Sequence, residues 1–140
     1  MERFVKKNIT LDNGEKYAYI EQGTGEKVFL LLHGNMSSSV YFYELLARIP
    51  NNIRVLAPDL RGFGDSSYNS RFNSLDELAD DVLNFVDKLK VREAYVLGWS
   101  TGAGVAYKIA AKKPTLVKKI ISLAGASYRG YPIFKKGDNN

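Results

Sequence analysis

A serine lies in a short glycine-bounded stretch that is typical of a nucleophile held on a sharp turn. Residues 98–102 read Gly98-Trp99-Ser100-Thr101-Gly102 and fall between a predicted strand and a predicted helix. A serine on such a turn needs small neighbours two residues away on each side, because bulk there would clash with the adjoining strand and helix. The turn would lift the Ser100 hydroxyl above the edge of a sheet. This spacing predicts nucleophilic chemistry at Ser100.

A hydroxyl that attacks a carbonyl also needs backbone N–H groups aimed at the oxygen that becomes negative. The N–H of Thr101, at the start of the predicted helix, is one candidate. A second loop, His33-Gly34-Asn35, follows another predicted strand. Gly34 allows the chain to turn tightly, so that the N–H of Asn35 can point into the same pocket. We therefore expect Asn35 and Thr101 to form an oxyanion hole.

The elements that must position these residues are indicated by alternating apolar runs and amphipathic stretches. This alternation predicts an α/β fold, in which a mostly parallel sheet has helices on both faces. Residues 6–11 and 16–21, separated by Asp12-Asn13-Gly14, predict an antiparallel hairpin at the start. The further elements that we expect are strands at 27–32, 53–57, 94–98 and 117–123, and helices near 40–48, from 74 onward and at 102–112.

The helix that begins at Ser74 has the clearest pattern. Ser74 and Glu77 have capping-box spacing, so that each side chain can accept a hydrogen bond from an unpaired N–H of the first turn. Apolar residues then follow at 3.6-residue spacing, namely Leu75, Leu78, Val82, Val86 and Leu89. We expect this stripe to pack against the sheet.

Length and composition limit the class of protein. A chain of 140 residues with 45% apolar and 25% charged residues has the size and composition of one ordinary globular domain, which excludes a disordered chain. It has no cysteine, which excludes disulfides, zinc–thiolate sites and a cysteine nucleophile. Residues 1–10 lack the apolar segment of a signal peptide, and the longest wholly apolar run, Val28–Leu32, has five residues. We expect a cytoplasmic protein without a membrane partner.

Charge is unevenly distributed along the chain. The net charge is +5, and residues 101–140 hold eight basic residues but a single acidic one, Asp138. Such a segment can indicate binding to nucleic acid, but no pattern of base-stacking aromatic residues lies among these lysines. We therefore expect a solvated basic face and no nucleic-acid partner.

Three motifs together resemble the N-terminal part of the α/β-hydrolase superfamily. They are His33–Asn35, the loop Asp59–Ser66 with the sequence DLRGFGDS, and the turn at Ser100. The resemblance covers nearly all of residues 1–126 and implies that the strand before His33 lies beside the strand before Ser100. It also implies a structural role for His33 and for the loop, with no catalytic role for the loop. Residues 127–140 would begin a lid or cap region, or form a disordered end.

The resemblance further implies a reaction class. Because the turn carries a serine and not an aspartate, it favours esters, thioesters, lactones or activated C–C bonds over the dehalogenase and epoxide hydrolase branches. The substrate would be a small acyl compound, and an apolar pocket for it could be lined by Trp99, Met36 and Tyr41 to Tyr43. Neither a metal nor an organic cofactor is implied.

The general base and the acid of such an enzyme normally follow the serine in the chain. After Ser100 this sequence has no histidine, and its single acid is Asp138. The 140 residues therefore cannot hold a complete triad. One interpretation is that a missing C-terminal half, or a second chain that completes the sheet, supplies both groups after about the sixth strand. The alternative is a catalytically inactive module that binds small molecules. An unpaired apolar edge at 117–123 favours the first interpretation.

Overall fold

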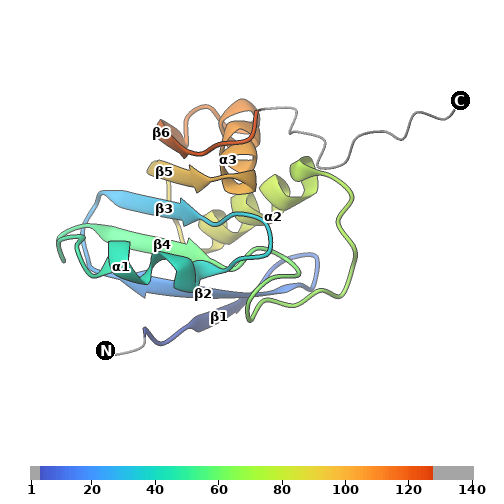
Figure 1. Cartoon of the computed structure of the whole chain (residues 1–140), viewed down its shortest axis with the longest axis horizontal. Coiled ribbons are helices and arrows are strands. Elements are labelled where there is room, and N and C mark those ends of the chain that lie inside the picture. The colour runs from blue at the N-terminus through green and yellow to red at the C-terminus, as the bar shows by residue number, and fades with distance from the viewer. Residues whose placement is uncertain (1–3, 128–140) are drawn as a thin grey trace, which may run out of the picture.

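The computed structural model describes residues 4–127, and its centre is a six-stranded sheet (Figure 1). The strands are β1 (Lys7–Thr10), β2 (Lys16–Gln22), β3 (Val28–Leu32), β4 (Arg54–Pro58), β5 (Ala94–Trp99) and β6 (Val117–Leu123). The helices are η1, a 3₁₀ helix (Ser39–Phe42), α1 (Tyr43–Leu46), α2 (Leu75–Lys88) and α3 (Thr101–Lys112). Apart from Ser127, the expected lid region 127–140 lies outside the described residues.

The strand order is β1-β2-β4-β3-β5-β6. Strands β4, β3, β5 and β6 run parallel, whereas β2 pairs antiparallel with both β1 and β4. The mostly parallel sheet with an antiparallel opening hairpin is thereby confirmed. Strand β3 lies directly beside β5, with Leu32 in register with Gly98. Because parallel strands end at the same edge of a sheet, the segments after Leu32 and after Trp99 leave the sheet side by side.

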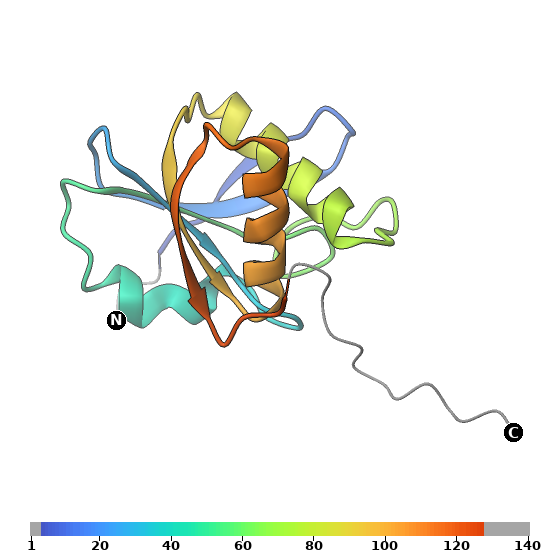
Figure 2. The ribbon, with the colours of Figure 1, turned by 90° about the horizontal axis from the view of Figure 1, so that it is seen from above.

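Helices cover both faces of the sheet, as the sequence predicts (Figure 2). On one face α2 and α3 pack over a large apolar core that includes Leu30, Val96 and Phe85. On the other face η1 and α1 are the helices, within the described residues, that lie over a smaller cluster, which includes Leu31 and Leu97. Successive side chains of a strand point to opposite faces, which is why Leu30 and Leu31 belong to different cores.

Helix α2 begins as its capping pattern predicts. The Ser74 Oγ accepts a hydrogen bond from the Glu77 N–H at 3.2 Å, and the Glu77 carboxylate accepts from the Asn73 N–H at 2.6 Å. The reciprocal bond thus reaches one residue further back than in the usual capping box.

Within residues 4–127, no helix combines the length and the apolar character needed to cross a bilayer.

The single helix expected near residues 40–48 is instead two short pieces, η1 and α1, of four residues each. Ser38 precedes η1 but makes no side-chain capping bond. The N–H of Ser39 donates to the Asp59 carboxylate at 2.7 Å, so that a distant side chain holds the start of this segment. The start of this segment is therefore held by a long-range contact and not by a local cap.

Part of the basic segment after residue 100 is paired with acids of neighbouring elements. The Lys108 Nζ lies 3.0 Å from an Asp76 carboxylate oxygen, and the Lys112 Nζ lies 2.8 Å from Asp80, so that ion pairs join α3 to α2. The lysine side chains are 15% and 33% exposed, so this part of the segment is an ion-paired contact between two helices and not a fully solvated face.

Within residues 4–127, the sheet face opposite α2 and α3 is bare over its β5–β6 side. Tyr95, Ile121 and Leu123 are 38%, 52% and 49% exposed. A groove of about 280 Å³ lies there, lined mainly by apolar residues that include Phe29, Tyr95 and Ile121. Among residues 4–127, β6 is an edge strand with one unpaired side. Long exposed edges with apolar faces are normally covered in native proteins.

Candidate active site

Ser100 occupies the turn between β5 and α3, in a strained backbone conformation. Its φ of +54° and ψ of −117° belong to a region that residues with a side chain rarely adopt. The Ser100 N–H donates to the Leu123 carbonyl at 2.9 Å, and its carbonyl accepts from the N–H groups of Ala103 and Ala126. The end of β6 and the loop after it therefore hold the turn in place, and the predicted strand–turn–helix geometry is confirmed.

The glycines on either side of Ser100 allow this turn to pack. A Cβ atom at Gly98 would overlap the backbone of Ala103 in α3. A Cβ atom at Gly102 would overlap the carbonyl oxygens of Leu32 and His33. Both positions are buried. The small residues two positions before and after Ser100 are thus required by close backbone contacts.

The loop after β3 lies directly against this turn. A Cβ atom at Gly34 would lie 3.0 Å from the Trp99 ring and 3.2 Å from the Cβ of Ser100. Asn35 follows and is exposed, and among residues 4–127 its N–H makes no hydrogen bond. Thr101 is the first residue of α3, so its N–H has no acceptor within the helix. The fold therefore places two unpaired N–H groups in the segments that flank the Ser100 hydroxyl.

His33 is fully buried, and both of its ring nitrogens are bonded to the backbone. Its Nδ1 lies 2.8 Å from the Gly34 carbonyl, and its Nε2 lies 2.9 Å from the Leu60 nitrogen. Because a carbonyl only accepts and an N–H only donates, Nδ1 carries the proton and Nε2 accepts. Burial lowers the pKa of His33, although the Gly34 carbonyl opposes this effect. His33 has no free nitrogen for Ser100 and holds two loops together.

Asp59 is a residue whose importance the sequence reasoning missed. Its carboxylate is fully buried and accepts from the Lys6 Nζ at 2.6 Å, the Ser39 N–H at 2.7 Å and the Asp65 N–H at 2.9 Å. Burial raises the pKa of Asp59, but these hydrogen bonds outweigh it and the pKa falls below its ordinary value. Gly64 leaves room for this carboxylate, because a Cβ atom there would overlap it.

The loop Asp59–Ser66 and the residues that follow it are held by further buried acids. Arg61 donates to both oxygens of Asp81 in α2, each at 2.7 Å. Glu15 is buried and accepts from the N–H groups of Asn69 and Ser70 and from the Ser67 hydroxyl. A buried carboxylate needs such partners, because losing its hydration is costly.

Of the residues expected to line an acyl pocket, Met36 and Tyr41 are exposed, whereas Trp99 is half-buried and Phe42 is buried. The rings of Trp99 and Tyr41 stack in parallel, with centroids 4.0 Å apart. Met36 is 89% exposed and has a φ of +53°. Trp99 is half-buried against the smaller core, whereas Tyr41 and Met36 are exposed.

Comparison with known proteins places this geometry in a family. The family model described as alpha/beta hydrolase fold matches residues 27–133. A hydrolase of Saccharomyces cerevisiae, described as uncharacterized, is 31% identical over 123 residues, which cover 86% of this chain and 42% of the yeast protein. The chain thus spans less than half the length of this curated relative.

Solved structures agree with the sequence match. The structure of the epoxide hydrolase CorEH superposes with a TM-score of 0.82 at 26% identity, over 94% of this chain and 47% of that one. A membrane phospholipase A superposes with a TM-score of 0.83 at 28% identity, over 94% and 42%. Together with the matched family model, these likenesses show that the chain belongs to the alpha/beta hydrolase fold family.

Proposed function

We propose that the chain carries the nucleophile and the oxyanion hole of a serine hydrolase that acts on a carboxylic ester or a related acyl substrate. The observation that carries this proposal is the strained turn at Ser100, with a φ of +54°, lying against the loop of Gly34. Strain of this kind persists where the surrounding structure enforces it, and it concentrates at functional sites. The Ser100 hydroxyl would attack the substrate carbonyl and form an acyl-enzyme.

The N–H groups of Asn35 and Thr101 would hold the oxygen that becomes negative during this attack. Neither group has an acceptor among the described residues that would compete for this role. Thr101 also stands at the positive end of the α3 dipole, which favours an anion there. Removing one donor of an oxyanion hole typically costs about 3–4 kcal/mol of transition-state stabilisation.

The general base and its acid would come from polypeptide other than these 140 residues. The sequence contains one histidine, His33, and both of its nitrogens are engaged by backbone groups. Without a base the Ser100 hydroxyl is a weak nucleophile. Within residues 4–127, the face at Tyr95 and Ile121 is exposed and the outer edge of β6 is unpaired, which supports the presence of a further segment that would cover them.

The substrate class rests on the hydroxyl at position 100. The similar solved structures are named for epoxide hydrolysis and for a phospholipase, which are different reactions. A serine hydroxyl that is activated by a base is suited to acyl transfer, which favours an ester. Tyr41 is exposed and stacks on the half-buried ring of Trp99 in the turn, and these two side chains could contact the acyl chain, as could Met36.

Chemical rescue tests this proposal on the 140-residue chain. A fluorophosphonate probe is added with and without free imidazole, and the labelled residue is identified by mass spectrometry. We expect little labelling without imidazole and labelling of Ser100 with it, because imidazole supplies the missing base. Ser100→Ala should abolish the label, whereas Ser122→Ala, at an exposed serine of β6, should retain it.

Two outcomes would contradict the proposal in different ways. Equal labelling of Ser100 without imidazole would show that the chain already holds a base. No labelling even with imidazole would show that Ser100 is not a competent nucleophile. The second result would favour the other candidate, a catalytically inactive module that binds small molecules. That candidate is also consistent with His33, whose two ring nitrogens are bonded to backbone groups and cannot activate Ser100.

A further inference from the structure

The loop between β3 and η1, residues 33–38, carries Asn35. Its first residue, His33, and the residue just after it, Ser39, both bond to the dipeptide Asp59–Leu60. At its start, the Nε2 of His33 accepts from the Leu60 N–H at 2.9 Å. At its end, the N–H of Ser39 donates to the Oδ1 of Asp59 at 2.7 Å. Asp59 and Leu60 follow β4, a different strand from the one that precedes the loop. The position of Asn35 therefore depends on where Asp59–Leu60 is held.

The second carboxylate oxygen of Asp59 is held by Lys6. The Lys6 Nζ lies 2.6 Å from the Oδ2 of Asp59 and 2.8 Å from the carboxylate of Asp65. The Asp59 side chain is completely buried and that of Lys6 is 13% exposed. A buried carboxylate is stable as an anion only where charge and hydrogen bonds replace its water. Lys6 is the cation that does so here.

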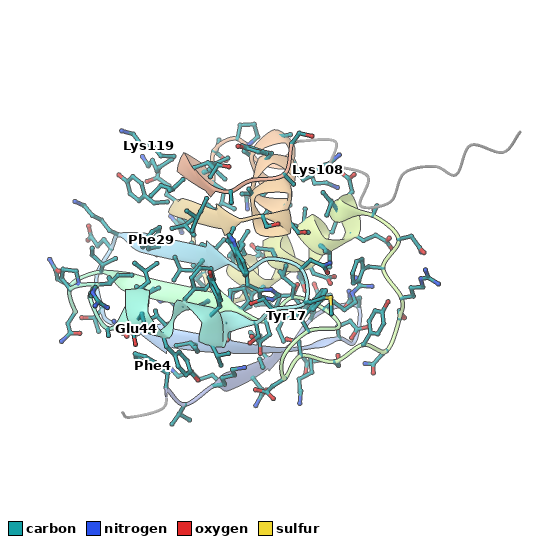
Figure 3. All side chains as sticks on the ribbon, in the orientation of Figure 1. Phe4, Tyr17, Phe29, Glu44, Lys108 and Lys119 are labelled. Atoms are coloured by element: carbon teal, nitrogen blue, oxygen red, sulfur yellow. The ribbon has the colours of Figure 1, made fainter. Side chains whose placement is uncertain are left out.

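Residues 4–6 also contact the helical segment beyond the loop. The Phe4 ring packs against Tyr43 of α1 with centroids 5.3 Å apart, and Figure 3 shows Phe4 next to that helix. The segment before β1 thus touches α1 through Phe4 and Asp59 through Lys6. The segment therefore connects α1 to Asp59, the acid that accepts the Ser39 N–H at the end of the loop.

We propose that Lys6 is a positioning residue for the oxyanion loop: acting through Asp59, it sets the position of the Asn35 N–H. The proposal rests on the proposed function only in assigning the Asn35 N–H a role in catalysis. Lys6 touches neither Ser100 nor a substrate in this arrangement. Its cation keeps Asp59 ionised, and the ionised carboxylate accepts the Ser39 N–H that closes the loop.

The neighbouring lysine provides a matched control. Lys7, the first residue of β1, also forms an ion pair, with Glu21 at 2.8 Å, but its side chain is 58% exposed. Lys6→Met and Lys7→Met therefore remove the same charge from adjacent positions, and only the first removes the partner of Asp59. Lys6→Arg retains the cation.

NMR spectroscopy of the 140-residue chain tests the proposal without depending on catalysis. In Lys6→Met we expect the amide signals of Asn35 and Ser39 to shift, the pKa of Asp59 to rise, and the Ser39 amide to exchange with solvent about tenfold faster or more. Lys7→Met should leave all three readouts at their wild-type values. Lys6→Arg should leave the three readouts close to their wild-type values, because it keeps a positive charge beside Asp59.

Unchanged signals of Asn35 and Ser39 in folded Lys6→Met would overturn the proposal, as would equal changes in Lys7→Met. If Lys6→Met does not fold, Asp65→Asn replaces it, since Asp65 is 71% exposed and its substitution weakens the hold on Lys6 from the surface. Asp65→Asn should shift the amide signals of Asn35 and Ser39 in the same direction by a smaller amount. If neither signal shifts, the proposal is overturned. Failure of the imidazole rescue at Ser100 would instead refute the proposed function, with these readouts unaffected.

Discussion

The backbone N–H of Leu60 donates to the Nε2 of His33 across 2.9 Å, and this bond fixes the imidazole as a neutral acceptor. The partner residues are 27 positions apart in the chain. The bond joins the loop after β3 to the loop after β4 at the edge of the sheet where Ser100 lies. Histidine is a common catalytic base, but His33 is a structural residue, because both of its ring nitrogens are bonded to backbone groups.

Replacing His33 by alanine should destabilise the chain by about 2–4 kcal/mol, because it leaves the Leu60 N–H buried without an acceptor and opens a cavity. His33→Gln should recover part of this loss, since its side-chain oxygen can reach the position of Nε2. Urea denaturation of the three proteins measures the difference. Equal stability of His33→Ala and wild type would show that the Leu60 bond has little energetic weight.

Stability should fall as the pH is lowered from 7.5 to 5.5. His33 has a folded-state pKa below its ordinary value of 6.5, so the unfolded chain binds the proton more readily than the folded chain. Its contribution is therefore present above pH 6.5 and decreases below it, by at most about 1.4 kcal/mol per pH unit.

His33→Gln is the control for this pH dependence, because the chain has no other histidine. The variant should show a flatter profile of unfolding free energy between pH 7.5 and 5.5. A slope that is the same in both proteins would assign the pH dependence to other groups.

Ser100→Gly should stabilise the chain by about 0.5–1 kcal/mol, because glycine adopts a φ of +54° and a ψ of −117° without strain. The matched control is Ser38→Gly, at a serine with extended backbone, φ −161° and ψ 180°, where the same change should destabilise. Thermal unfolding of both variants measures the effect. A lower melting temperature for Ser100→Gly than for wild type would argue against strain at the turn.

Two glycines of α3 should respond differently to alanine. In Gly102→Ala the new methyl group meets the backbone carbonyl of Leu32, which cannot move aside, so we expect a loss of about 2–3 kcal/mol. In Gly104→Ala it meets the Cδ1 of Leu75, a flexible side-chain end, and the higher helix propensity of alanine offsets the crowding. Gly104→Ala should therefore stay within about 1 kcal/mol of wild type. Similar losses in both variants would contradict the close approach of Gly102 to β3.

The sequence by itself determined the elements and the turn at Ser100. Strand β6 has the predicted bounds, and α2 begins after Ser74 as its cap predicts. These features could be predicted because they depend on neighbours within a few residues, through side-chain period, capping and steric limits around Ser100. The short, uncapped segment of η1 and α1 lacked such a local signal, and its length was predicted wrongly.

Only the tertiary structure decided how the site is held. The bond from Leu60 to His33 and the contact of Lys6 with Asp59 span 27 and 53 positions of the chain. No local pattern indicates which of several acids will be buried or which lysine will neutralise it. That choice depends on the strand order, which brings β3, β4 and the segment before β1 together, and on the cost of burying a carboxylate without a cation.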